Sequence, residues 1–111
     1  MSEIFFLLIA AHFLLDLVLQ PQAMANGKNR RHSIHLEASN GFPPWPYWMT
    51  GHASGHGAAV LLITGQLWLG LVETALHWII DFTKCEGRIN FHTDQALHLV
   101  CKFGYCYYLF G

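Results

Sequence analysis

The chain has 111 residues, of which 53% are hydrophobic, 12% are charged and eight are histidines. The charged share is about half of what is usual in a globular domain, so the composition favours a membrane protein. The formal net charge is −1, and no basic stripe with interleaved aromatic residues occurs, so we expect no nucleic-acid partner. The length allows one domain, which we place at residues 1–111.

The first half of the chain is expected to contain one helix and one long connection. Apolar residues continue from about residue 3 to residue 20, and Pro21 ends the run. Residues 21–50 form a polar connection. Three prolines argue against a regular helix in its last part, namely Pro43, Pro44 and Pro46.

The second half is expected to contain three helices. Residues 51–84 are mostly apolar and exceed the length of about 20 residues that one membrane span needs. A break near the middle gives helices at about 51–64 and 66–84, although one broken element fits the same residues. A last helix is expected at about 93–110, where Lys102 must pair or reach the helix end.

These segments together predict an all-α fold, namely an integral membrane four-helix bundle with short transmembrane helices. Basic residues gather in the first and third connections, at Lys28, Arg30, Arg31, Lys84 and Arg88. The positive-inside rule makes these connections cytoplasmic and leaves both termini outside. We therefore expect a multi-pass protein in contact with the lipid bilayer, whose short helices pack in a homo-oligomer or against other membrane subunits.

Ionisable side chains recur at helical spacing in every predicted helix. Residues three or four apart share one face of a helix. Because successive helices alternate in direction, all of these side chains fall in the same, cytoplasmic half of the bundle. The resulting candidate metal ligands are His12, Asp16, His52, His56, His77, Asp81, Asp94 and His98.

The chemistry of these donors favours a divalent transition metal. Imidazole and carboxylate together suit Zn²⁺, Mn²⁺ or Fe²⁺ better than Ca²⁺ or Mg²⁺. Eight donors allow either two ions, or one ion with further carboxylates that orient the histidines. Glu73 is a candidate general base or a hydrogen-bond acceptor for His77. Gln20 and Gln95 are expected to support the ligands or to cap helices.

Each pair also has a structural interpretation when it is taken alone. His12 with Asp16 fits an intrahelical hydrogen bond, and Asp94 fits the first turn of a helix. The glycines beside His52 and His56 equally indicate close packing of helices.

All eight candidate ligands lie in the same half of the predicted bundle, and this shared position decides which function we expect. It predicts a membrane-embedded metal-binding protein, namely a metal-dependent hydrolase with a mononuclear or dinuclear site near the cytoplasmic face. The alternative is a non-enzymatic metal-binding or ion- or proton-conducting membrane subunit. A third interpretation is a b-type haem protein with two axial histidines on facing helices.

The motifs in this order also resemble a known family. They are His12-x3-Asp16-x3-Gln20, His52-x3-His56, His77-x3-Asp81 and Asp94-Gln95-x2-His98. In this combination the chain resembles an uncharacterised family of small bacterial and phage integral membrane proteins, described as a domain of unknown function. The resemblance covers nearly the whole chain apart from residues 29–50. It implies the bacterial inner membrane or a phage context, and it marks these His, Asp and Gln positions as functional without implying an activity.

Overall fold

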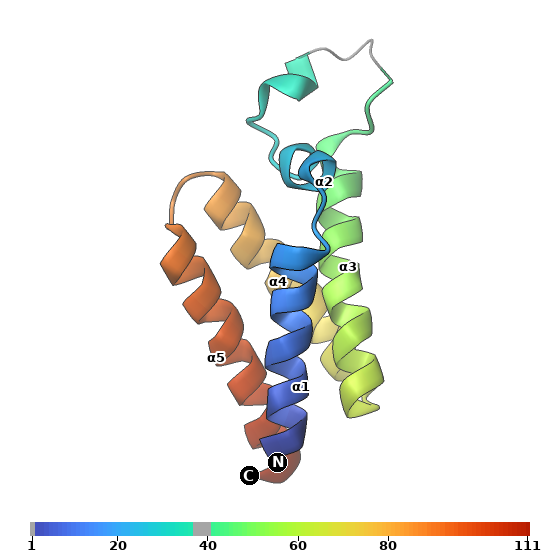
Figure 1. Cartoon of the computed structure of the whole chain (residues 1–111), viewed down its shortest axis with the longest axis vertical. Helices are drawn as coiled ribbons and strands as arrows, with labels where there is room; N and C mark the ends of the chain where they lie inside the picture. The colour runs from blue at the N-terminus through green and yellow to red at the C-terminus, as the bar shows by residue number, and fades with distance from the viewer. Residues whose placement is uncertain (1, 37–40) are drawn as a thin grey trace.

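The computed structural model describes residues 2–36 and 41–111, which form an all-α fold. Four helical segments of this described part alternate in direction, and both chain ends lie at one end of the molecule (Figure 1). Helix α1 contacts α3 and α5, and α4 contacts the same two helices. The bounds are α1 Ser2–Phe13, α3 Trp45–Thr64, α4 Leu67–Cys85 and α5 Phe91–Phe110.

Three short elements join α1 to α3. One π-helical turn, η1 (Leu14–Val18), continues α1 directly. The short helix α2 (Gln22–Gly27) and the 3₁₀ turn η2 (Ser33–Leu36) then lie at the end of the bundle opposite the chain ends (Figure 1). The first connection is therefore partly helical.

The predicted membrane bundle is wrong. Within residues 2–36 and 41–111, no helix combines the length and the apolar character that crossing a bilayer requires. Helix α1 has only 12 residues, and α4 and α5 carry buried charged residues such as Glu73 and Lys102. The apolar composition misled the prediction because a span depends on uninterrupted apolar length within one helix. The predicted multi-pass inner-membrane location with external termini is wrong for the same reason.

Helix α3 begins at Trp45, within the connection that was expected to extend to residue 50. Pro44 is the N-cap of this helix, and Pro46 lies in its first turn. The first backbone N–H groups of a helix have no intrahelical acceptor, so a proline there removes no hydrogen bond. The prolines therefore start the helix rather than prevent it.

The turn between α3 and α4 is short because Gly65 ends α3 in the left-handed conformation. Its φ is 72°, and its N–H donates to the Leu61 carbonyl over 2.7 Å. A side chain would strain this backbone conformation. Residues 51–84 accordingly contain parts of two antiparallel helices rather than one broken element.

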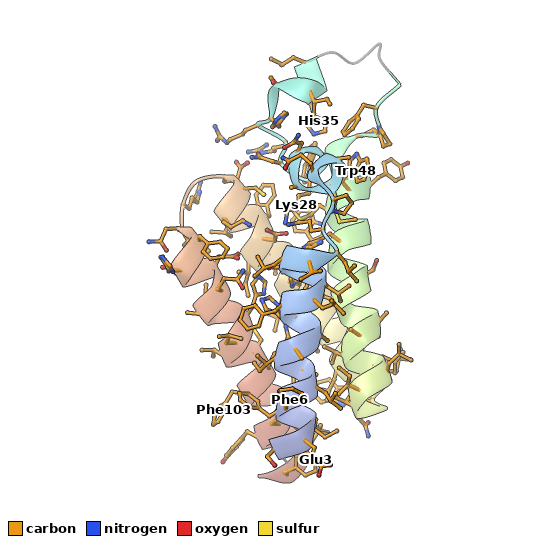
Figure 2. The ribbon with its side chains drawn as sticks, in the orientation of Figure 1. Glu3, Phe6, Lys28, His35, Trp48 and Phe103 are labelled. Atoms are coloured by element: carbon orange, nitrogen blue, oxygen red, sulfur yellow. The ribbon has the colours of Figure 1, made fainter. Side chains whose placement is uncertain are left out.

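The interior of the bundle is divided into an apolar and a polar half. Near the chain ends, an apolar cluster contains Leu8, Val60, Leu69, Tyr105 and Cys106. The other half encloses most of the buried ionisable side chains. Many large apolar side chains lie on the outer faces instead, such as Phe103, which is 54% exposed (Figure 2). Much of the hydrophobic composition is thus outside the core.

The α3–α4 interface depends on two facing glycines. A Cβ atom on Gly57 would lie 1.9 Å from Thr74 Oγ1 and 2.6 Å from the Gly70 carbonyl oxygen. A Cβ atom on Gly70 would lie 2.8 Å from the Gly57 carbonyl oxygen. The helices therefore approach backbone to backbone. This approach lets the neighbouring His56 and His77 rings stack, with centroids 3.7 Å apart.

Substitution Gly57→Ala should destabilise the fold, because overpacking a tight interface costs about 1–3 kcal/mol. Gly55→Ala is the matched control, since a Cβ atom there meets nothing within 4 Å. Alanine at that exposed helical position should be neutral or stabilise the protein by up to about 1 kcal/mol. Urea denaturation of both variants measures the difference, and equal stabilities would contradict the close α3–α4 contact.

Candidate metal centre

The backbone around Asp16 departs from a regular α-helix. The Leu19 N–H donates to the Leu14 carbonyl, five residues earlier, over 2.7 Å. Such π-helical turns are rare and occur frequently at functional sites. The Gln20 side chain donates to the Asp16 carbonyl over 2.9 Å. Gln20, for which a supporting or capping role was predicted, thus contacts the backbone of this turn.

Three imidazoles converge on one oxygen of the buried Asp16 carboxylate. Its Oδ1 atom lies 2.9 Å from His52 Nε2, 3.2 Å from His56 Nε2 and 3.6 Å from His77 Nε2. The first contact is a hydrogen bond. The Nε2 atoms of His56 and His77 are buried without a hydrogen-bond partner. Buried polar atoms are nearly always satisfied, so these two nitrogens are candidate ligand atoms.

The spacing of these atoms matches that of metal donors. Zinc binds nitrogen and carboxylate oxygen at about 2.0–2.2 Å in a tetrahedron, which separates adjacent donors by about 3.4 Å. The three distances from Asp16 Oδ1 lie on both sides of this value. All four donor atoms of Asp16, His52, His56 and His77 lie within 4.8 Å of one another. We call these four residues the Asp16 cluster.

The second Asp16 oxygen is held by Gln95. The Gln95 Nε2 atom donates to Asp16 Oδ2 over 2.9 Å and to Asp94 Oδ2 over 3.0 Å. Its Oε1 atom lies 2.9 Å from His12 Nε2, within hydrogen-bond distance. One amide side chain thus contacts two carboxylates and one imidazole.

Two further donor groups lie beside the Asp16 cluster. One consists of Asp16, Asp94 and His98, and the other of His12, His77 and His98. His98 Nε2 lies 3.4 Å from Asp94 Oδ1, and neither atom has a hydrogen-bond partner. The fold therefore brings seven of the eight predicted ligands into donor groups. The seven are His12, Asp16, His52, His56, His77, Asp94 and His98.

Asp81, the eighth predicted ligand, has a different environment. It accepts a 2.6 Å hydrogen bond from the buried Lys28, which lies near α2 (Figure 2). His52 Nε2 lies 3.4 Å from the same Asp81 oxygen. No role in the site was predicted for Lys28, since no local pattern links residues 53 positions apart.

Glu73 lies on the far side of His77 from Asp16. Its Oε1 atom is 3.6 Å from His77 Nδ1, whereas His77 Nε2 faces Asp16. Lys102 donates to one Glu73 oxygen, and the Tyr105 hydroxyl donates to the other over 2.8 Å. Carboxylates behind a ligating histidine set its orientation. This geometry favours a role for Glu73 in positioning His77 over a role as general base.

Burial keeps most of these imidazoles neutral. It lowers the pKa of His12 to about 4 and that of His56 to about 3, and it also lowers the pKa of His52. Burial acts in the same direction on His77, but the nearby Asp16 and Glu73 carboxylates outweigh it and raise the pKa. Burial opposes ionisation of Asp16, yet the imidazole contacts hold its pKa far below the usual range. Neutral imidazole and carboxylate are the forms that bind metal.

These shifts predict acid sensitivity of the chelator-treated protein. His12 and His56 have lower pKa values folded than unfolded, so between about pH 6.5 and pH 4 the unfolded state binds more protons. Their contribution to stability is present above pH 6.5 and is lost as the pH falls. His77 has the opposite sign, because its contribution is complete below pH 6.5 and is lost as the pH rises through its raised pKa.

Urea denaturation between about pH 7 and pH 4.5 should therefore show a falling free energy of unfolding, on the order of 2 kcal/mol for each of the two histidines. The variant His56→Gln should lose less stability over the same interval, because one depressed group is absent. Parallel curves for the variant and the unaltered protein would contradict the assignment of His56 as a buried neutral imidazole.

Comparison with known proteins identifies a family but no described relative. No curated protein and no solved structure matches the chain. A family model with the description "Protein of unknown function (DUF3307)" matches residues 4–103. The match includes all eight predicted ligands and agrees with the predicted resemblance to a domain of unknown function. This chain therefore belongs to the DUF3307 family.

Proposed function

We propose that the protein binds a divalent transition metal ion, Zn²⁺, Mn²⁺ or Fe²⁺, in the Asp16 cluster. The observation that carries this proposal is the pair of buried, unpartnered nitrogens on His56 and His77, both directed at the Asp16 carboxylate. Mixed imidazole and carboxylate donors suit these borderline ions. His52 is the fourth donor, and it has an additional partner in Asp81.

The balance of buried charge supports a cation at this position. Glu73 is paired with Lys102, and Asp81 is paired with Lys28. Among the described residues, the ion-pair contacts of Asp16 and Asp94 are with histidines rather than with lysine or arginine. Two carboxylates without a lysine or arginine partner carry two formal negative charges. One divalent ion would balance them.

The packing of the imidazoles favours an ion over haem. The rings of His56 and His77 stack with an interplanar angle of 21°, and those of His77 and His98 are 4.2 Å apart at 25°. A b-type haem would need room for a porphyrin between two facing histidines, and stacked rings leave no such space.

Hydrolysis is the second candidate function, and the position of His52 favours it. Its Nε2 atom lies between the Asp16 and Asp81 carboxylates, at 2.9 and 3.4 Å. A zinc-type ion with three protein ligands lowers the pKa of its bound water to about 7. In this second candidate the ion has Asp16, His56 and His77 as its three ligands, and His52 does not bind it. His52 then keeps the Nε2 proton that it donates to Asp16, and it can donate this proton to a leaving oxygen as a general acid. The two carboxylates would favour the protonated form of its ring.

Metal analysis tests the binding proposal. Protein loaded with Zn²⁺ or Mn²⁺ should retain stoichiometric metal, and chelation should lower its Tm. Replacing a ligand, as in His56→Ala or His77→Ala, should weaken binding by at least about 100-fold, since even outer partners account for about 10–100-fold. The exposed His92→Ala is the matched control and should change neither value. If the protein retains no stoichiometric metal and the chelator leaves its Tm unchanged, the proposal is refuted.

A turnover assay tests the hydrolytic role separately. The probes are para-nitrophenyl phosphate, bis(para-nitrophenyl) phosphate and para-nitrophenyl acetate, with metal-loaded protein. We expect metal-dependent turnover, which His52→Ala should reduce by about 10²–10⁴-fold if His52 donates the proton. Metal content measured on the same samples separates lost chemistry from lost metal. If turnover is no faster than with the free ion, the hydrolytic role is refuted, whereas the metal-binding proposal is unaffected.

A further inference from the structure

We infer that a second divalent ion binds to Asp94 and His98 and is bridged to the first ion by the Asp16 carboxylate. This inference rests on the proposed function, because the first ion occupies the Asp16 cluster. It changes the site from a mononuclear to a dinuclear centre. We call Asp16, Asp94 and His98 the second site.

The two oxygens of Asp16 face different sets of donors. Oδ1 is near the imidazoles of His52, His56 and His77. Oδ2 accepts from Gln95 and lies 3.7 Å from His12 Nε2. A carboxylate oxygen of Asp16 also lies within 4.8 Å of ligand atoms of Asp94 and His98. Asp16 therefore belongs to both donor groups, as a bridging ligand must.

The second site has its own unsatisfied atoms. His98 is 1% exposed and Asp94 is 0% exposed. His98 Nε2 and Asp94 Oδ1 lie 3.4 Å apart, and both lack a hydrogen-bond partner. Their separation equals the distance of about 3.4 Å expected between adjacent donors on one zinc-type ion.

A structural role in the first turn of α5 does not account for Asp94. Acidic residues are favourable in the first turn of a helix, and Asn90 already caps this one by accepting from the Thr93 N–H. The Asp94 carboxylate is fully buried, with one oxygen bonded to Gln95 and the other unused. Burying a charged oxygen without a partner is costly, whereas a bound ion would satisfy it.

Gln95 explains why Asp16 and Asp94 stay close to each other. Two neighbouring carboxylates repel, and the Gln95 amide donates to one oxygen of each. This leaves Asp94 Oδ1 and His98 Nε2 free. His12 is excluded from the second site because its Nε2 atom is engaged with Gln95 Oε1.

Charge identifies the class of additional ligand. Asp16 and Asp94 supply two negative charges, so two divalent ions leave an excess of two positive charges. The other buried carboxylates, Asp81 and Glu73, do not balance this excess, because Lys28 and Lys102 already pair with them. A dinuclear centre here would therefore take an oxyanion, such as hydroxide or phosphate. Pairs of ions in phosphoryl-transfer enzymes bind oxyanions in the same way.

Manganese titration tests the second site. We expect the unaltered protein to bind two Mn²⁺ ions per chain by calorimetry, with an exchange-coupled electron paramagnetic resonance spectrum. Asp94→Asn and His98→Gln should each bind one Mn²⁺ with an uncoupled six-line spectrum, and the affinity of the first ion should change less than 10-fold. His92→Ala, on the same helix, is the matched control and should still bind two.

The outcomes separate the two proposals. One uncoupled Mn²⁺ in the unaltered protein overturns the second site and leaves the first. No bound Mn²⁺ or Zn²⁺ overturns the metal-binding proposal itself. Inorganic phosphate should raise the affinity for the second ion at least 10-fold, and no effect of phosphate would overturn the oxyanion assignment. If both variants fail to fold, as judged by circular dichroism, the stoichiometry and spectrum of the unaltered protein still decide the question.

Discussion

The Asp16 carboxylate is buried at the centre of the bundle, and within the described residues no lysine or arginine pairs with it. Removing such a charge from water costs several kcal/mol unless hydrogen bonds or an ion compensate. The surrounding helices provide that compensation: α3 and α4 direct imidazoles at one oxygen, and α5 directs Gln95 at the other. The π-helical turn and the facing glycines of α3 and α4 are the backbone features that permit this arrangement.

Two buried ion pairs lie near this centre. In each pair a lysine neutralises a second buried acid, so that acid adds no net charge to the centre. Lys28 neutralises Asp81 beneath α2, and Lys102 neutralises Glu73 behind His77. Removing one partner of such a pair is strongly destabilising, whereas an apolar replacement of both is often neutral. These two pairs therefore matter for where they hold Asp81 and Glu73 rather than for stability. Glu73 lies 3.6 Å from His77 Nδ1, and Asp81 gives His52 a second carboxylate.

The candidate site was largely predictable because helical periodicity and alternating helix direction are both visible in the sequence. Spacing places His12 near Asp16 and His52 near His56, and antiparallel connection brings these pairs to one level. The contacts of Lys28 with Asp81 and of Tyr105 with Glu73 join residues 53 and 32 positions apart, and no local pattern encodes them. The π-helical turn has no sequence signature either. The membrane assignment failed because composition averages over outer and inner faces, whereas a span requires one continuous apolar helix.

We propose that Asp16 and the imidazole nitrogens of α3 and α4 hold one ion together. X-ray absorption spectroscopy of the zinc-loaded protein can examine this arrangement, because the spectrum reports the atoms bound to the metal. We expect nitrogen and oxygen neighbours at about 2.0–2.1 Å with the multiple scattering of imidazole. Sulfur neighbours at about 2.3 Å from the free cysteines, or a shell of oxygen without imidazole scattering, would contradict it.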